Sequence, residues 1–308
     1  MKAFSASDAA LEGFRITREN PWAFARWVLV SFVVSLLGAV VTVSMPAEVR
    51  DALATINSDE TPSLTKLLDA LLALLPLLTF GLAVQCMMAA AVYRLILRHD
   101  DTRFGYLRLG IDELRLMALT IILVLLFIVF MVLITLGAAL VMALASVAGQ
   151  SVAIFVGSVT EAFLTGLLVF VAVRLSLAPV ATFAEKRLTI FESWQLTRGQ
   201  FWRLLGAYVL ALACIVVLGF LALVIFTALA GVILLATGQQ MTDLAAVFTP
   251  DASSFRTYFS PALVAYMFVG SVFSALYYAV IAAPGAVAYQ ALHGDVLPKP
   301  LSAQAEPG

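Results

Sequence analysis

The sequence predicts an all-α polytopic membrane protein with six transmembrane helices, and three observations lead to that fold class. Hydrophobic residues fill 63% of the 308 positions, charged residues only 12%, and the mean hydropathy is +1.04. Soluble domains carry about half apolar and roughly a quarter charged residues, so much of this chain is expected to lie in lipid. The apolar residues also form continuous runs, which are typical of membrane helices and not of the alternating strands of a β-barrel.

Six apolar segments are long enough to cross the hydrocarbon as helices, which takes about 20 residues. They cover approximately residues 22–45, 67–97, 114–148, 152–184, 202–237 and 261–291. Several exceed 30 residues, so we expect tilt or protrusion beyond the bilayer. The first run is about 24 residues long, which is too long for the apolar part of a signal peptide, so we interpret it as a retained span.

The basic residues divide unevenly between the two sides of this topology. Fifteen lysines and arginines lie on the side that holds both termini, and only Arg50, Lys66 and Arg256 lie on the other. Because lysine and arginine collect in cytoplasmic loops, both termini are predicted to be cytoplasmic.

A short polar phrase recurs directly before long apolar runs. Residues 12–22 read EGFRITRENPW and residues 192–202 read ESWQLTRGQFW, with a weaker copy, GYLRLGIDELR, at 105–115. Self-similarity of this kind indicates a repeated structural unit. The chain is therefore predicted to contain three helical hairpins, with repeats at approximately 7–98, 99–187 and 188–293. They would form one six-helix domain over residues 1–296, with a flexible tail at 297–308.

The polar segment before each hairpin, residues 7–19, 105–115 and 188–198, is called its preface. We expect each preface to contain a short amphipathic helix on the cytoplasmic membrane surface. Phe14 and Arg18 fall on one face at helical spacing, as do Trp194 and Arg198 in the third preface. Aromatic side chains beside arginine suit the headgroup layer, where an apolar body and a charged tip are both accommodated.

Candidate binding residues lie in or beside the prefaces and near the cytoplasmic ends of the second and fourth spans. The preface arginines are expected either to anchor the protein structurally, or to bind lipid phosphates or pair with Glu12 and Glu192 of another repeat. Two further arginines are placed near the cytoplasmic interface, where their side chains can snorkel. The candidate lipid- or partner-binding residues are Arg18, Arg198, Trp22, Trp194, Trp202, Arg94 and Arg174.

Glu161 is the candidate intramembrane ion or proton site. It lies 13 residues before Arg174, which is about 20 Å deeper at the rise of an α-helix. A lone carboxylate at that depth is expected to be protonated, paired with another helix, or exposed to a water-filled cavity. Two interpretations stay open: a neutral acid bonded to a carbonyl or hydroxyl, and a proton or cation site.

Catalytic and metal-binding motifs are missing, so neither an enzyme nor a metal or cofactor site is expected. The sequence contains no HExxH, CxxC pair, phosphate-binding loop, GxGxxG or GxSxG in a fitting context. His99 and His293 are too few for a zinc site, and Cys86 and Cys214 are interpreted as buried inert thiols. The net charge of −1 gives no argument for nucleic acid as a partner.

The central part of the chain resembles a bacterial membrane family. Residues 192–199, ESWQLTRG, preceded by RLSLAP at 174–179 and followed by FWR at 201–203, carry this resemblance. They look like the membrane domain attached to some glycerophosphoryl diester phosphodiesterases, and like stand-alone bacterial membrane proteins. The resemblance implies a bacterial inner membrane. The soluble phosphodiesterase barrel is absent from this chain, so no catalytic residue is carried over.

Two functions from different classes follow as expectations. The first is a non-catalytic membrane protein that binds lipid, a membrane partner protein or a second copy of itself in envelope maintenance. The second is a small-solute or proton-coupled transporter that uses Glu161. Three hairpins of one orientation fit the inverted repeats of familiar transporters less well. An enzyme acting on lipid ranks third because its motifs are missing.

Overall fold

The computed structural model describes residues 5–46, 64–98, 103–236 and 254–293, together with residues 49 and 238. The predicted tail at 297–308 and His99 lie outside the described residues. Six described helices are long and apolar enough to cross a membrane, which confirms an all-α multi-span fold. They are α2 (Pro21–Ser44), α4 (Leu64–Leu97), α5 (Ile111–Val147), α6 (Gln150–Leu175), α9 (Phe201–Ala236) and α12 (Pro261–Leu292). The shorter elements are α1 (Ala6–Glu19), η1 (Arg103–Tyr106), α7 (Ala178–Glu185), α8 (Glu192–Leu196) and α11 (Phe255–Tyr258).

Local sequence explains where several of these helices begin and end. A tight turn joins α5 to α6 at Gly149, whose φ of +115° is rarely open to a residue with a Cβ atom. Helix α7 begins after a two-residue break, and Pro179 occupies its first turn, where its missing N–H costs nothing. Pro21 likewise opens α2, directly after Asn20 has ended α1. Each of these boundaries lies at a glycine or a proline, the two residues with special backbone demands.

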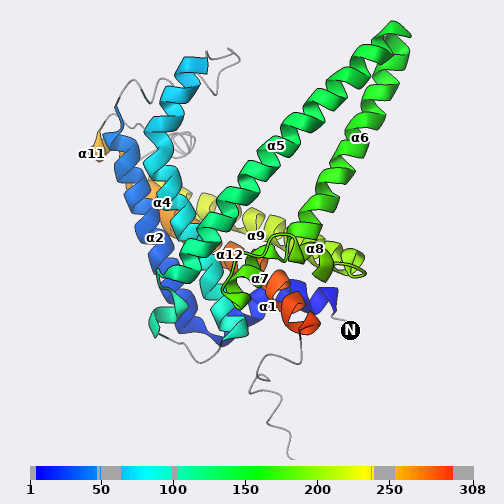
Figure 1. Ribbon diagram of the computed structural model, residues 1–308. Helices are drawn as coiled ribbons and strands as arrows, with labels where there is room; N and C mark the ends of the chain where they lie inside the picture. Colours follow the sequence, from blue (N-terminus) through cyan, green and yellow to red (C-terminus); the bar gives the residue numbers. More distant parts are fainter. Residues whose placement is uncertain are drawn as a thin grey trace, which may run out of the picture.

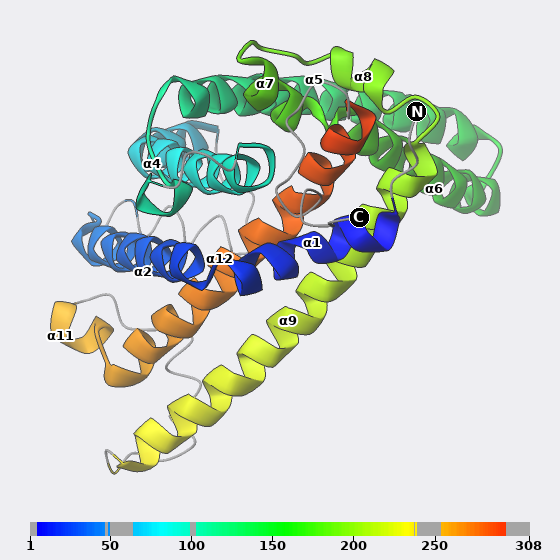
Figure 2. The same cartoon turned by 90° about the horizontal axis from the view of Figure 1, so that it is seen from below.

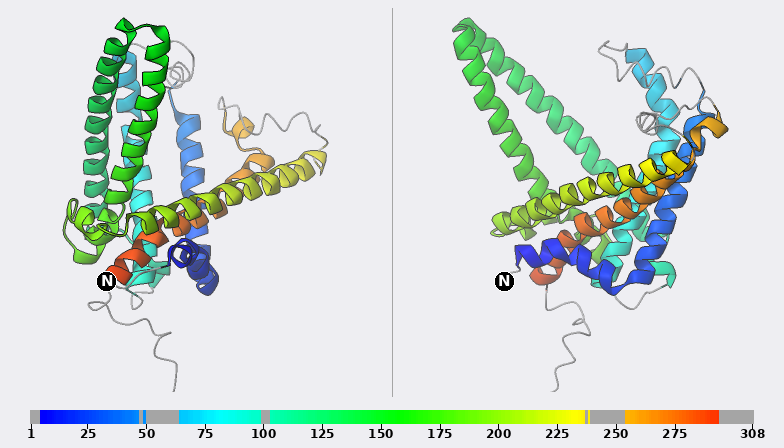
Figure 3. Two further views of the ribbon diagram at one scale, coloured as in Figure 1. Left: turned by 90° about the vertical axis from the view of Figure 1, so that its right-hand side faces the viewer. Right: turned by 180° about the vertical axis from the view of Figure 1, so that it is seen from behind.

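The long helices spread from one end of the molecule (Figure 1). Helices α5 and α6 pack on each other and form an arm, while α9 and α12 run crosswise to the other four long helices (Figure 3, left). The shared end is called the hub. It consists of α1, η1, α7 and α8, the first turns of α2, α5 and α9, and the last turns of α4, α6 and α12.

Helix α12 is the central helix of the hub. It packs against α1, α2, α4 and α9, and Figure 2 shows α1 lying across α12 and α9. Its residues 282–286 read AAPGA and are all buried. Small residues let helix backbones approach closely, so this stretch brings several helices to one place. At Gly285, a Cβ atom would lie only 3.0 Å from the Tyr208 hydroxyl of α9.

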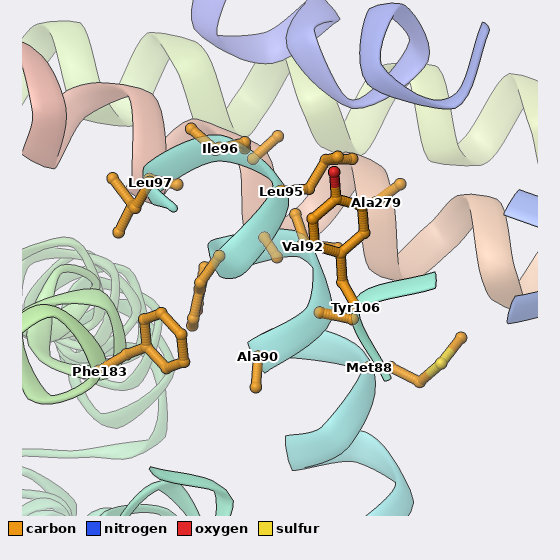
Figure 4. Packing of buried hydrophobic residues seen from close by; sticks show 14 of the residues in the cluster. Met88, Ala90, Val92, Leu95, Ile96, Leu97, Tyr106, Phe183 and Ala279 are labelled. Atoms are coloured by element: carbon orange, nitrogen blue, oxygen red, sulfur yellow. The ribbon is translucent and has the colours of Figure 1, made fainter. Parts of the chain in front are cut away.

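The hub core is completed by the last turns of α4. Figure 4 shows Val92 and Leu95 of α4 near Ala279 of α12, with Met88 and Phe183 on opposite sides of this stretch of α4. These side chains belong to one buried cluster that draws on α2, α4, α5, α7 and α12. Residues that are far apart in sequence therefore converge at this end of the molecule.

The first pair of spans differs from the expected hairpin. Helix α2 packs mainly against α12 and not against α4, its sequence neighbour among the spans. A cavity of about 450 Å³ lies between α2 and α4, lined almost entirely by apolar side chains of the two helices. The second and third pairs, α5 with α6 and α9 with α12, do pack as hairpins.

The three prefaces do not share one structure. The first is a regular helix of 14 residues, whereas the third contains only the five-residue α8. In the second preface, Gly105 and Tyr106 have φ values of +70° and +67°, which no α-helix contains, and the chain then runs without helix to Gly110. The expected amphipathic helix is therefore seen in full only before α2.

Within the hub, the small residues of α1 face α12. Ala9 and Ala10 are fully buried, and a Cβ atom at Gly13 would lie 2.6 Å from the Val280 Cα of α12. The two helices are thus in direct backbone contact, while Arg18 points outward. The first preface is a packed element of the hub as well as an amphipathic helix.

Candidate functional site

A buried ion pair joins the end of α4 to the second preface. Arg94 Nη2 pairs with Glu113 Oε1, and the two side chains are 1% and 2% exposed. Arg94 Nη1 also donates to the Tyr106 carbonyl at 2.9 Å, and Glu113 Oε2 accepts from the Gly110 N–H at 2.8 Å. Buried charges are tolerated when they are paired and hydrogen-bonded in this way. The pair therefore holds the irregular second preface in a single position.

This burial changes the interpretation of Arg94. The sequence suggested that its side chain snorkels to the headgroups and binds lipid or a partner. At 1% exposure the guanidinium has no surface to offer a headgroup, and two of its nitrogens are engaged inside the protein. Arg94 is a structural residue of the hub. Its partner lies 19 residues away in sequence, beyond the reach of local pattern reasoning.

A second set of charges extends this network to α7. Arg98 lies 3.4 Å from Asp112, which also accepts from Arg115 at 2.9 Å. Arg98 donates to the Phe183 carbonyl at 3.1 Å, and its guanidinium lies 4.8 Å from the centroid of the Phe183 ring. Arginine over an aromatic face is attracted by the ring quadrupole. The ends of α4 and α7 and the start of α5 are thus tied together.

Arg174 ties α6 to the third preface. Its Nη1 lies 3.3 Å from Thr197 Oγ1, and the Ser193 hydroxyl donates to the Arg174 carbonyl at 2.7 Å. The guanidinium also lies 5.2 Å from the ring centroid of Phe170 and 5.5 Å from that of Trp194. Unlike Arg94, Arg174 is only half-buried, and Trp194 beside it is exposed. Both therefore keep surface that a ligand can reach.

The remaining candidates lie on the outer surface of the hub and are called the rim: Arg18, Trp22, Arg198 and Trp202. All four are exposed, the tryptophans at 80% and 79%. The rim has two parts, because Arg18 lies in the last turn of α1 and Gly206 of α9 lies beside Ala6 in its first turn. The two parts are separated by about the length of α1, roughly 20 Å at helical rise.

Glu12 of the first preface and Glu192 of the third pair with arginines that are close to them in sequence. Glu12 lies 3.4 Å from Arg15, and Glu192 lies 3.0 Å from Arg187. Partial burial raises the pKa of Glu12, and the Arg15 charge opposes that shift. The hydrogen bond from Arg187 to Glu185, with the nearby Glu192 charge, raises the pKa of the Arg187 guanidinium. In the described part of the chain, neither Glu12 nor Glu192 pairs with Arg198 or Arg18 of the other repeat, which was one of the alternatives.

A cavity of about 620 Å³ lies between α4, α5, α6, α9 and α12 where these helices leave the hub, and Pro179 of α7 also lines it. Among the described residues that line it, none carries a formal charge at neutral pH. Its polar lining consists of Gln85, Cys86, Tyr93, Thr120, Ser176, Tyr208, Tyr277 and Tyr278. The remaining walls are aliphatic apart from Pro179. The cavity can therefore accept an apolar molecule that carries a neutral hydrogen-bonding group.

Glu161 lies away from the hub, on the arm. It is exposed and lines a cavity of about 330 Å³ between α5 and α6, together with Thr160 and Thr165. Glu161 makes no hydrogen bond or ion pair with the described residues. The structure thus places it beside two hydroxyl side chains and brings none of the other candidate residues near it.

Metal-ligating residues are dispersed over the described part of the chain. No group of three or more His, Cys, Asp or Glu side chains there could hold a metal ion. Cys86 and Cys214 are free thiols on different helices, and only Cys86 is fully buried. His293 stacks on Tyr289 with ring centroids 4.2 Å apart.

Three residues of the site were not singled out from sequence. Trp27 is buried and its Nε1 donates to the Gly105 carbonyl at 2.7 Å, which fixes the second preface on α2. Glu113 is the partner of Arg94, and Tyr93 is a buried wall of the central cavity. For Glu113 a signal exists, because a glutamate three residues into a helix favours a bond back to the helix start. For Trp27 and Tyr93 the sequence holds no comparable signal.

Comparison with known proteins leaves the fold as the basis for classification. No protein-family model matches the chain, and the searches of curated proteins and solved structures gave no match either. The class that the fold defines is an all-α, multi-span membrane protein.

Proposed function

We propose that this chain is a non-catalytic protein of the bacterial inner membrane that binds membrane lipid through its rim and serves envelope maintenance. One observation carries the proposal: Trp22 and Trp202 are almost fully exposed at the first turns of two apolar helices, each following an exposed arginine by four residues. Tryptophan is enriched at membrane interfaces, and the guanidinium group binds phosphate with two parallel hydrogen bonds. An anionic phospholipid headgroup matches this pairing of groups.

The hub is proposed to face the cytoplasm. The support is the charge distribution, with fifteen basic residues on the side of the termini and three on the other. Reporter fusions provide the test. A fluorescent protein fused after residue 308 should fold and fluoresce, whereas alkaline phosphatase inserted near residue 250 should be active. The reverse pattern would place the hub outside.

An internal repeat is also part of the proposal. The second and third prefaces each contact the second long helix of the preceding repeat, the second through Arg94 of α4 and the third through Arg174 of α6. The first contacts α12 through Gly13, which closes the series. This cyclic order is the contact pattern that three related hairpins around a common hub would make.

Lipid stabilisation tests the rim. The purified chain should gain thermal stability in detergent when phosphatidylglycerol is added, because the headgroup is anionic. The double variant Arg18→Gln, Arg198→Gln should lose most of that gain. The matched control is Arg256→Gln, an exposed arginine on α11. If the double variant keeps the full gain, or if the control loses as much, the rim does not bind the headgroup.

A transporter that uses Glu161 is the second candidate function. It is favoured by one observation, the exposed carboxylate beside a cavity between two apolar helices, since ionisable residues inside membranes commonly mark ion pathways. Reconstituted vesicles should then show proton-coupled flux that Glu161→Gln abolishes and Thr165→Val weakens. Flux that survives Glu161→Gln would remove this candidate.

A further inference from the structure

The hydroxyl of Tyr93 is the most unusual polar group of the central cavity. The residue is only 6% exposed and its ring packs on Phe183 with centroids 5.7 Å apart, so the side chain is held in place. Its hydroxyl has no hydrogen-bond partner within the described residues, and it is not sealed from the cavity that Tyr93 lines. Because the hydroxyl is fixed in place and reachable from the cavity, it is available to donate a hydrogen bond to an oxygen of a molecule that occupies the cavity.

Further hydroxyl groups lie at the same end of the cavity. Tyr208 of α9 and Ser176, at the break between α6 and α7, both line it. Tyr208 reaches this place because Gly285 leaves room for its hydroxyl, 3.0 Å from where a Cβ atom would stand. Ser176 donates its hydroxyl to the Val173 carbonyl at 2.8 Å and also interacts with Tyr208, so Tyr93 carries the one hydroxyl of these three described residues that is left for an occupant.

The lining excludes a charged head. No lysine, arginine, aspartate or glutamate is among the described residues of the cavity wall. The buried Arg94 of the hub is already paired with Glu113, and Arg174 is directed toward Thr197 and Trp194. A phosphate or carboxylate placed here would be desolvated without a counter-charge, which is strongly unfavourable. An uncharged hydroxyl or carbonyl group meets no such penalty.

The cavity also has an apolar exit. Val209 and Leu212 of α9 line it and are exposed at the same time, as is Val169 of α6. These side chains lead from the hydroxyl end to the surface between α6 and α9. A hydrocarbon chain can therefore leave the cavity along the spans while its head stays at the hub. The volume of about 620 Å³ falls within the range of roughly 300–1,000 Å³ of small-molecule pockets.

We propose that this cavity binds the uncharged head of a neutral lipid of the diacylglycerol type. Tyr93 donates its hydroxyl to a glycerol or ester oxygen beside Tyr208 and Ser176, and the acyl chains pass out along Val209 and Leu212. This site differs from the rim in ligand charge and in position. The two sites can therefore be tested separately.

Direct binding of dioleoylglycerol to the purified chain in nanodiscs tests the proposal. Tyr93→Phe keeps the ring and removes the hydroxyl, so the affinity should fall about 5- to 10-fold, the effect of one hydrogen bond. Ala172→Phe fills the cavity from an exposed wall position, so binding should be lost. The matched controls are Tyr258→Phe on α11 and Ala139→Phe at an exposed position of α5, which should bind as the unaltered chain does.

Two results would overturn the proposal. The first is that Ala172→Phe binds dioleoylglycerol as well as the unaltered chain does. The second is that the cavity, which Ala172→Phe blocks, binds phosphatidylglycerol more tightly than dioleoylglycerol. The rim variant Arg18→Gln, Arg198→Gln separates this proposal from the proposed function. It should lose the stabilisation by phosphatidylglycerol and keep dioleoylglycerol binding, so that either site can fail without the other.

Discussion

The hub and the arm of α5 and α6 are built from similarly apolar sequence, yet they pack in opposite ways. In the hub, Ala279, Ala283 and Ala286 of α12 are completely buried, whereas in the arm Leu133, Leu136 and Leu140 of α5 are 62–64% exposed. Residue size separates the two regions. Small side chains let several helices meet, and large ones cover surface that is left to lipid. Hydrophobicity alone therefore does not tell where a membrane helix is buried.

Charge separates the two regions in the same way. The hub encloses Arg94 and Glu113 as a buried ion pair, and the arm carries Glu161 exposed and without a partner among the described residues. We expect the hub to depend on the charge of Glu113, and the arm to tolerate the loss of the charge of Glu161. Substitutions at matched positions in the hub and at the periphery should therefore differ in their effect on stability.

The largest effect is expected for Glu113→Ala. Removing one partner leaves the Arg94 charge buried and unpaired, which costs about 3–5 kcal/mol. Thermal unfolding of the purified protein, followed by fluorescence-detected size-exclusion chromatography, should show a large loss of stability. Glu161→Ala on the arm should change the stability by less than about 0.5 kcal/mol. Similar losses in both variants would remove the distinction between the regions.

Gly13→Ala should rank second. The added methyl group would lie 2.6 Å from the Val280 Cα, so α1 has to move away from α12. Overpacking of this kind costs about 1–3 kcal/mol. Gly38→Ala in α2 is the control, since nothing lies within 4 Å of its Cβ position and alanine is the better helix former by about 1 kcal/mol. The same unfolding assay should therefore give opposite signs, and equal signs would contradict the packing argument.

Trp27→Phe is expected to have a moderate effect. It removes the hydrogen bond to the Gly105 carbonyl and leaves that acceptor buried, at a cost of about 1–3 kcal/mol. Trp22→Phe changes an exposed ring five residues earlier, and its stability in detergent should stay within about 0.5 kcal/mol. Limited proteolysis near Gly105 gives an independent measurement. Cleavage there should accelerate in Trp27→Phe alone.

The smallest effect concerns acidity at Glu12. Because burial raises the pKa of this carboxyl, the folded protein binds its proton more tightly than the unfolded chain does. Its contribution to stability is therefore present below the ordinary glutamate pKa and is lost as the pH rises through the raised pKa. Glu12→Gln should flatten the dependence of the melting temperature on pH in that acidic window. An unchanged profile would show that Glu12 is not the group responsible.

Much of the fold could be predicted from sequence, because the signals are local. The six spans follow from run length, and the turn at Gly149 and the break before Pro179 follow from residues with special backbone demands. In each case the information lies within a few residues of the feature.

The rest of the site depends on contacts between distant segments. Arg94 looked like a surface group because its sequence neighbours are polar, and only the position of α5 brings Glu113 to it. The second preface looked helical by analogy with the first. Its backbone is instead determined by Trp27 and Arg94, which each bind one of its carbonyl oxygens. The central cavity is lined by residues of six helices, so no single stretch of sequence indicates it.

The central place of α12 has a consequence for biosynthesis. About 240 residues separate the end of α1 at Glu19 from the start of α12 at Pro261. At synthesis rates of roughly 5–20 residues per second, α1 waits on the order of 10–50 s for the helix that covers its small-residue face. During that interval the nascent chain carries an uncovered contact surface at its N-terminal end. A ribosome that stalls before α12 would leave the hub unassembled, and quality-control proteases would find it in that form.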